Sequence, residues 1–264
     1  MQTIALNKPG AFSYNILFPA AWDELTKEEL EAVALAQLGV YETEYMSKAI
    51  VFISLLSIRA NAQAVTLPGG WKENLNIEDA ATQGFDSIDF LYTDNTRTIN
   101  PYPELIVGKK RMIGPADDFN EILCGEMEDC EVFFTQFSEA PDLQLLASIA
   151  AVLWRPRNAP YQTKASESRK EIFKSLLPEQ LFSIYIWYTG CRNQLPKIFP
   201  LVYGGGESTG EADPASFTKC IHAGAGPKNG TRNNIRIMPA KEFLFDMQLE
   251  AEHAEALKEQ YERS

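Results

Sequence analysis

The feature that most constrains the fold is a set of apolar stripes with helical spacing along this 264-residue chain. The segment from about residue 42 to 60 is apolar nearly all round. A helix without a polar face must be covered by other elements, so this one is expected at the centre of a core. Its apolar positions are Met46, Ala49, Ile50, Phe52, Ile53, Leu55 and Leu56. We therefore predict a mainly α fold, a multi-helix bundle.

The preceding helix has a defined start and end. Thr26 is a good N-cap, and Glu29 stands three residues later, as a capping box requires. Gly39 is a suitable C-terminal residue, because glycine adopts the left-handed conformation without strain. The short connection at Gly39 predicts an αα-hairpin with the helix that follows.

Further helices are predicted toward the C-terminus. Met127, Cys130, Phe134 and Phe137 are spaced i, i+3, i+7 and i+10, which is an apolar helical stripe. The other predicted helices cover about residues 143–154, a segment from Pro178 that includes the apolar run 181–188, a short one from Asp213-Pro214 to His222, and one from Pro239 to about Glu262.

The middle of the chain has a different pattern. Turn-forming residues dominate from Pro68 to Pro115, and Leu105–Val107 and Arg111–Ile113 flank a Gly-Lys-Lys turn. This pattern predicts a small irregular or β-hairpin insertion over residues 66–115. The expected domains are a helical main domain, 1–203, which contains the insertion, and a linker plus C-terminal helical segment, 204–264.

Negative charge is concentrated in residues 117–142, which carry nine carboxylates and no Lys or Arg in a chain of net charge −12. The sign excludes sequence-independent binding to nucleic acid, which needs clustered cations, and disfavours anionic membrane surfaces. Aromatic residues in the same stretch predict a docking surface for a protein with a basic surface. The alternative is an amphipathic core helix with a polar outer face. A cationic stretch, 155–174, is predicted to face the acidic one across the bundle.

The predicted partner-binding residues fall on two helices. The C-terminal helix carries an apolar seam with 4-7-3-4 spacing, interrupted by Glu250, which fits an intramolecular lid or an oligomer or partner contact. The predicted residues are Glu128, Glu131, Phe133, Phe134 and Phe137 on the acidic helix, and Phe243, Met247, Leu257 and Tyr261 on the C-terminal helix.

Motifs for catalysis or metal binding are weak. Gly206-Glu207-Ser208-Thr209-Gly210 matches the nucleophile pattern of serine hydrolases, follows a possible strand, Ile198–Tyr203, and would use His222 as base. The three glycines before Ser208 and the Glu-Ala-Asp-Pro after it favour a loop instead. Cys191, Cys220 and His222 lack the paired spacing of zinc ligands. We expect no enzyme, metal or cofactor, and keep the serine hydrolase as an alternative.

The cysteines and the apolar runs predict the cellular compartment of the protein. Four widely spaced cysteines without a C-x-x-C pair indicate reduced thiols, and hence the cytoplasm. The most apolar stretch, Ala49–Ile58, is shorter than the ~20 residues that cross a bilayer.

Three segments carry a resemblance to a known class of proteins. They are Phe18-Pro-Ala-Ala-Trp-Asp-Glu-Leu-Thr26, Phe119-Asn-Glu-Ile-Leu-Cys-Gly-Glu126 and Leu153-Trp-Arg-Pro156. Their order resembles proteins encoded among the tail and virion genes of tailed bacteriophages and prophages. The resemblance implies a non-enzymatic role as a tail-assembly chaperone or minor virion component, in the host cytoplasm or the virion. An oligomeric scaffold is a further alternative.

Overall fold

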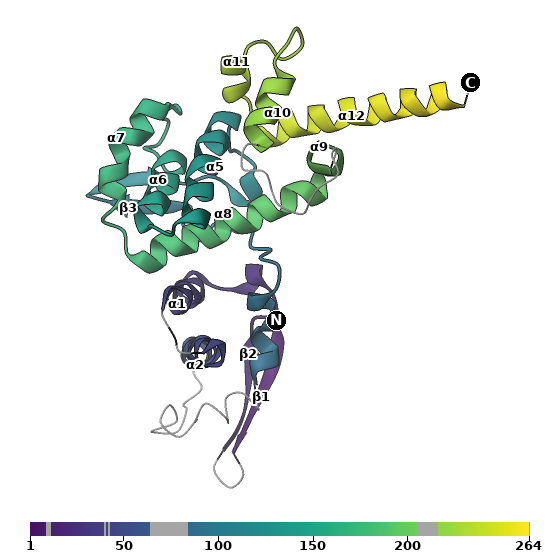
Figure 1. The fold of residues 1–264 in the computed structure, drawn as a ribbon. Coiled ribbons are helices and arrows are strands. Elements are labelled where there is room, and N and C mark those ends of the chain that lie inside the picture. Colours follow the sequence, from purple (N-terminus) through teal and green to yellow (C-terminus); the bar gives the residue numbers. More distant parts are fainter. Residues whose placement is uncertain (9–11, 40, 42, 64–83, 205–215, 264) are drawn as a thin grey trace. The chain divides into compact units, whose positions relative to one another are not determined.

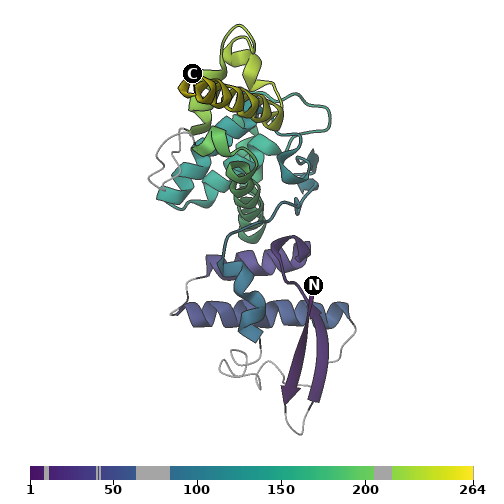
Figure 2. The ribbon, with the colours of Figure 1, turned by 90° about the vertical axis from the view of Figure 1, so that its right-hand side faces the viewer.

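The structure, a computed structural model, describes residues 1–8, 12–39, 41, 43–63, 84–204 and 216–263. Most of these residues are helical, and the strands form two small antiparallel hairpins (Figures 1 and 2). The predicted mainly α class, with a small β-hairpin insertion, is confirmed. The chain forms two compact units, residues 1–97 with 177–190, and residues 98–176 with 191–264.

The first unit combines a β-hairpin with helices. Strands β1 and β2 are antiparallel, with Gln2 opposite Phe18 and Lys8 opposite Phe12. The elements are β1 (Gln2–Lys8), β2 (Phe12–Phe18), η1 (Trp22–Glu24), α1 (Lys27–Leu38), α2 (Glu44–Ala62), η2 (Phe85–Tyr92) and the first part of α8 (Pro178–Ile198).

The core of this unit confirms that the second predicted helix is central. Phe52, Leu55 and Leu56 of α2 are fully buried, and the Phe52 ring lies 5.7 Å from that of Phe18 on β2. Ile186 of α8 belongs to the same core. The hairpin, α1, α2, η2 and the start of α8 therefore share one apolar cluster.

Two arginines satisfy buried polar groups in the first unit. The predicted capping box is present, since Glu29 Oε2 accepts from Thr26 N at 2.8 Å and Glu29 N donates to Thr26 Oγ1 at 3.3 Å. The fully buried Glu29 carboxylate also accepts from Arg59 Nη2 of α2 at 2.7 Å, which ties α2 to α1. Arg97 donates to the carbonyl oxygens of Trp22 and Leu25 at 2.8 and 2.9 Å.

The second unit begins with the predicted hairpin. Strands β3 and β4 pair with Leu105 opposite Met112, and the turn residues Gly108 and Lys109 have φ angles of +53° and +68°. Positive φ at both positions is typical of the two-residue turns that join twisted strands. The elements are β3 (Glu104–Val107), β4 (Lys110–Ile113), η3 (Asp117–Phe119), α5 (Cys124–Glu139), α6 (Leu143–Leu153), α7 (Thr163–Phe173), the end of α8, α9 (Pro200–Gly204), α10 (Ser216–Gly224), α11 (Arg232–Arg236) and α12 (Ala240–Glu262).

Helices α5, α6 and α7 pack in sequence order and form the centre of the second unit. The predicted apolar face of α6 is buried, including Leu146, Ala150 and Leu153. Helices α10, α11 and the first turns of α12 pack on α5. The rest of α12 extends beyond the other elements of its unit, at the yellow end of the ribbon (Figure 1).

Two expectations differ from the structure. Residues 198–203, expected as a possible strand, form no strand: α8 ends at Ile198 and α9 begins at Pro200, with Phe199 N donating to Leu195 O and Tyr203 N donating to Phe199 O. Pro200 favours this outcome because it fits the first turn of a helix. The compact units also do not divide at residues 203 and 204, because the elements after residue 215 pack on α5 and belong to its unit.

Candidate functional site

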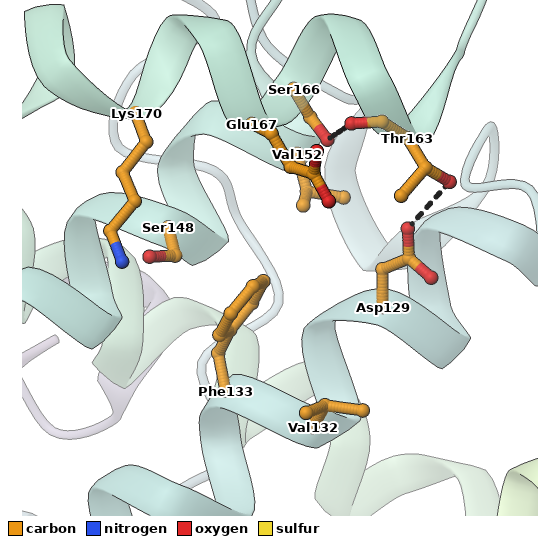
Figure 3. A pocket seen from close by; sticks show the side chains of 9 residues that line it. All are labelled: Asp129, Val132, Phe133, Ser148, Val152, Thr163, Ser166, Glu167 and Lys170. Atoms are coloured by element: carbon orange, nitrogen blue, oxygen red, sulfur yellow. Dashed lines mark hydrogen bonds between the residues drawn. The ribbon is translucent and has the colours of Figure 1, made fainter.

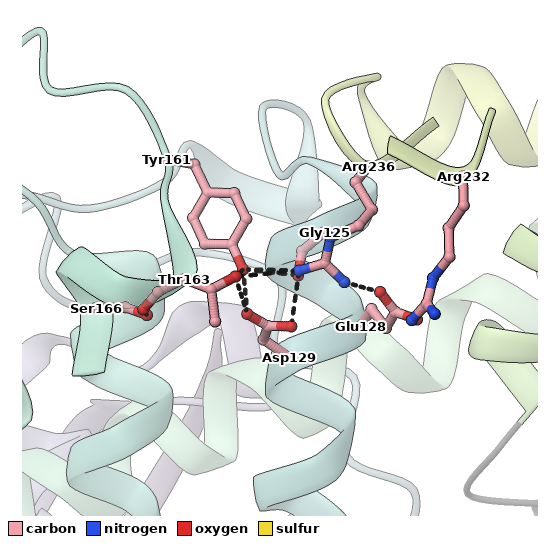
Figure 4. Close-up of polar contacts among 8 residues, drawn as sticks. All are labelled: Gly125, Glu128, Asp129, Tyr161, Thr163, Ser166, Arg232 and Arg236. Atoms are coloured by element: carbon pink, nitrogen blue, oxygen red, sulfur yellow. Dashed lines mark hydrogen bonds and ion pairs between the residues drawn. The ribbon is translucent and has the colours of Figure 1, made fainter. Parts of the chain in front are cut away.

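The acidic face of α5 is directed into its own unit. Glu128 is only 4% exposed, and its carboxylate pairs with two arginines of α11. Arg232 Nη2 lies 2.6 Å from Glu128 Oε1, and Arg236 pairs with Oε2 (Figure 4). A buried carboxylate requires such compensation, because desolvation of an isolated charge is costly.

Asp129 is the centre of a hydrogen-bonded cluster beside this pair. It accepts from Arg236 Nη2 at 2.9 Å, from Thr163 Oγ1 at 3.0 Å and from the Tyr161 hydroxyl (Figure 4). Burial, and then the bond to the Asp129 carboxylate, raise the pKa of Tyr161, so this phenol stays protonated and donates. Burial lowers the pKa of Arg236, but the guanidinium stays charged at neutral pH. The cluster joins α5, α7 and α11.

Gly125 allows the close approach on which this cluster depends. A Cβ at this position would lie 2.9 Å from the ring of Tyr161 and 3.0 Å from the carbonyl oxygen of Arg236. The Tyr161 hydroxyl also lies 3.0 Å from the carbonyl oxygen of Gly125. A side chain at position 125 would therefore push α11 or Tyr161 away from α5.

Two further carboxylates of α5 have arginine partners. Glu131 is 3% exposed and accepts from Arg192 Nε at 2.9 and 3.0 Å. The same guanidinium lies 4.7 Å from the ring centroid of Phe134, within the range of a cation–π contact. Glu126 is buried, accepts from Leu123 N at 2.9 Å and contacts Arg155. The pair of Arg155 with Glu126 confirms in part that the cationic stretch 155–174 faces the acidic one.

These contacts correct the interpretation of α5 as an exposed acidic docking surface. Glu128 and Glu131 are buried and paired, so in this fold they do not face a partner. The physical reason is that arginines distant in sequence supply the opposite charge that the local stretch lacks. The carboxylates of residues 117–142 that accept from groups elsewhere in their unit are Asp117, Asp118, Glu126, Glu128, Asp129 and Glu131.

The predicted aromatic contacts divide into buried and accessible residues. Phe137 and Phe243 are buried in the core, so they do not fit a role as exposed anchors. Phe133 and Phe134 are half-buried, because Lys170 and Arg192 lie over their rings. Only part of each ring therefore faces outward.

The C-terminal helix keeps its predicted apolar seam exposed. Phe243 anchors the base of α12, and Met247 is half-buried. Leu257 and Tyr261 stand on the projecting half and are 46% and 82% exposed. Residues i and i+4 of a helix share one face, so these two side chains form a continuous apolar surface.

A cavity of about 370 Å³ lies among α5, α6 and α7. Phe133 and Val132 of α5 line one side, Val152 of α6 lies beside Ser166 and Glu167 on the other, and Lys170 and Thr163 of α7 stand at opposite ends (Figure 3). It adjoins the cluster around Asp129, and Asp129 and Thr163 contribute to both.

The groups proposed for catalysis are not brought together in the described part of the chain. Ser208 and the glycine-rich motif 206–210 lie outside the described residues. His222 is exposed on α10. Burial raises the pKa of Cys124 to about 12 and that of Cys130 well above its usual value, so both thiols are protonated and poor nucleophiles.

Within the described ranges, no group of three or more His, Cys, Asp or Glu side chains is arranged to hold a metal ion. Among the same residues, none of the helices combines the length and apolar character needed to cross a bilayer.

Sequence reasoning missed the arginine partners of α5. Arg192, Arg232 and Arg236 lie 61 or more residues from the carboxylates that they bind. Their only signal is the spacing of Arg232 and Arg236, which stand four apart and so share one face of a short helix. The cavity had no sequence signal.

Comparison of the chain with family models, with curated proteins and with solved structures finds no match.

Proposed function

We propose that this protein is a non-enzymatic assembly or structural protein of the tailed-phage type, either a tail-assembly chaperone or a minor virion component, which acts by binding another protein. The order of the three sequence segments that resemble virion and tail gene products supports the class. The apolar surface on the projecting half of α12 supports the mode of action.

The observation that carries the proposal is the continuation of one helical seam past the body of its unit. Phe243 packs this seam into the core at the base of α12. The same face then continues through Ala254, Leu257 and Tyr261, where it is exposed to solvent. Burying a leucine and a tyrosine against a partner gives several kcal/mol, roughly 25 cal/mol per Å² of apolar surface.

The charge on α12 defines the partner that fits. Residues 242–264 carry seven acidic and two basic residues, so their net charge is −5. Lys228, outside the helix, pairs with Glu250 at 2.8 Å near its base. A partner with an apolar groove and a basic rim would match both the seam and its flanks. This surface replaces Glu128 and Glu131 as the proposed basis for binding a basic protein.

The test is affinity capture with the purified chain, in the presence of the proteins encoded beside its gene. Wild type should retain one basic protein, identified by mass spectrometry and then purified. The double variant Leu257→Asp/Tyr261→Asp should bind that protein at least tenfold more weakly, because hot-spot side chains contribute about 2 kcal/mol or more each.

The control is Ile106→Asp on β3, which removes an exposed apolar side chain and adds a negative charge in the same unit, one where the double variant adds two. It should bind like wild type. Equal binding by wild type and the α12 double variant would overturn the proposed interface. Light scattering tests the alternative of an oligomeric scaffold, in which the partner is a second copy of the chain. In that case the assembly formed by the double variant should have a lower mass than the wild-type assembly.

A further inference from the structure

The cavity among α5, α6 and α7 has an apolar interior and charged groups at its edge. Phe133, Val132 and Val152 provide the apolar walls (Figure 3). Ligand-binding cavities in proteins measure roughly 300–1,000 Å³ and combine apolar walls with a few polar groups. At about 370 Å³, this cavity has room for a small molecule.

Most of its polar groups already have partners inside the protein. Ser148 Oγ donates to Gln144 O at 2.8 Å, and Ser166 Oγ donates to Thr163 O at 2.6 Å. Asp129, at the other end, is neutralised by Arg236. These groups hold the helices together and leave little capacity to donate to a ligand.

Lys170 differs from them. Its ammonium lies 6.0 Å from the ring centroid of Phe133, and within the described ranges it makes neither an ion pair nor a hydrogen bond. The side chain is half-buried and reaches from α7 toward the floor of the cavity (Figure 3). An ammonium in this position has three donors available for an anion.

We propose that this cavity binds a small apolar carboxylate, with the acid on Lys170 and the apolar part between Phe133, Val132 and Val152. An aryl or alkyl acid satisfies both features, because the ammonium attracts the carboxylate and the walls exclude water from the rest. The acid is either a free small molecule or the C-terminal carboxylate of a peptide that ends in an apolar residue.

One group opposes the anion. Glu167 stands one turn before Lys170 and is exposed at the edge of the cavity. Its charge repels a carboxylate, although water and salt screen the repulsion. The site therefore gives two substitutions with opposite expected effects, which a purely structural role of either residue would not produce.

The probe is 3-phenylpropionate, and its neutral amide is the matched ligand. Binding is measured by titration calorimetry on the full chain. Wild type should bind the acid with a Kd of about 0.1–1 mM, as expected of a small ligand, and the amide at least tenfold more weakly. Lys170→Met should weaken acid binding about tenfold or more, and Glu167→Gln should strengthen it.

Two controls separate the cavity from general effects. Lys174→Met removes a lysine one turn further along, which pairs with Glu171 at 2.7 Å, and should leave binding unchanged. Val132→Trp fills the cavity from an exposed position and should abolish binding without unfolding the chain. Equal binding of acid and amide, no binding of either, or full binding by Lys170→Met would overturn the proposal.

A second arm identifies the source of the acid. An acetylated tripeptide that ends in phenylalanine is titrated with a free and with an amidated C-terminus. Tighter binding of the free-acid peptide than of 3-phenylpropionate assigns the site to a chain terminus, and weaker binding assigns it to a free acid. Both results require a carboxylate, and equal affinity of the two peptide forms contradicts the proposal.

Discussion

Removal of the Glu128 carboxylate should destabilise the second unit more than removal of an exposed carboxylate does. Glu128 is 4% exposed and binds two arginines, so Glu128→Ala leaves Arg232 and Arg236 without their shared partner. Deleting one member of a buried ion pair typically costs about 3–5 kcal/mol, because the remaining charge stays desolvated.

The expected cost is at or just below the lower limit of that range. Arg236 keeps its bond to Asp129 at 2.9 Å, and the side chain of Arg232 is 45% exposed, so water can solvate it. We therefore expect a loss of about 2–3 kcal/mol. In a unit of this size, each kcal/mol lowers the Tm by about 2–4 °C, which predicts a decrease of about 4–12 °C.

The assay is thermal unfolding followed by circular dichroism, with Glu250→Ala as the control. Glu250 also pairs with a cation, Lys228, but both side chains are more than half exposed. Exposed pairs contribute little, so this variant should unfold with wild type. If Glu128→Ala and Glu250→Ala gave the same Tm, Glu128 would be solvated, and the original interpretation of α5 as a docking surface would be restored.

Two further predictions concern the interior of each unit. In the second unit, Cys124 and Cys130 of the native protein should resist alkylation by iodoacetamide up to about pH 10, because both are buried and burial raises the pKa of Cys124 to about 12. Both should react once guanidinium unfolds the chain. Rapid labelling of the native protein, identified by mass spectrometry, would disprove their burial. In the first unit, Arg59→Met should lower the midpoint of urea unfolding, because the fully buried Glu29 loses its cation. Lys27→Met should not, because the Lys27 side chain is half exposed and its ammonium lies 3.9 Å from Glu31, whose side chain stays in contact with water.

The sequence predicted the helices and the hairpin better than it predicted the contacts that these elements make with one another. The capping box at Thr26, the β3–β4 hairpin and the apolar face of α6 follow from residues a few positions apart, so local pattern was sufficient. Helix α9 was missed because the apolar run before the glycines fits a strand or a helix equally well, and periodicity does not separate the two in so short a segment.

The candidate site required contacts between distant parts of the chain. No local pattern shows that Arg192 binds Glu131, or that Arg236 binds both Glu128 and Asp129. The same limit applies to the cavity, since its walls come from three helices whose packing decides which side chains face one another. Leu257 and Tyr261 were predictable because the seam of α12 is a local pattern.

Charge density along a sequence is therefore a poor guide to charge on a surface. The stretch 117–142 contributes −9 to a net charge of −12, yet its central carboxylates are neutralised by arginines from α8 and from α11. If a partner senses negative charge, it must do so where carboxylates lack such neighbours. Helix α12 meets this condition, because in its projecting half the cations that pair with Glu259 and Glu262 lie on the same exposed helix and are screened by water. The binding of α12 to a basic partner should therefore weaken as the salt concentration rises. The buried ion pairs of Glu128 should be much less sensitive to salt.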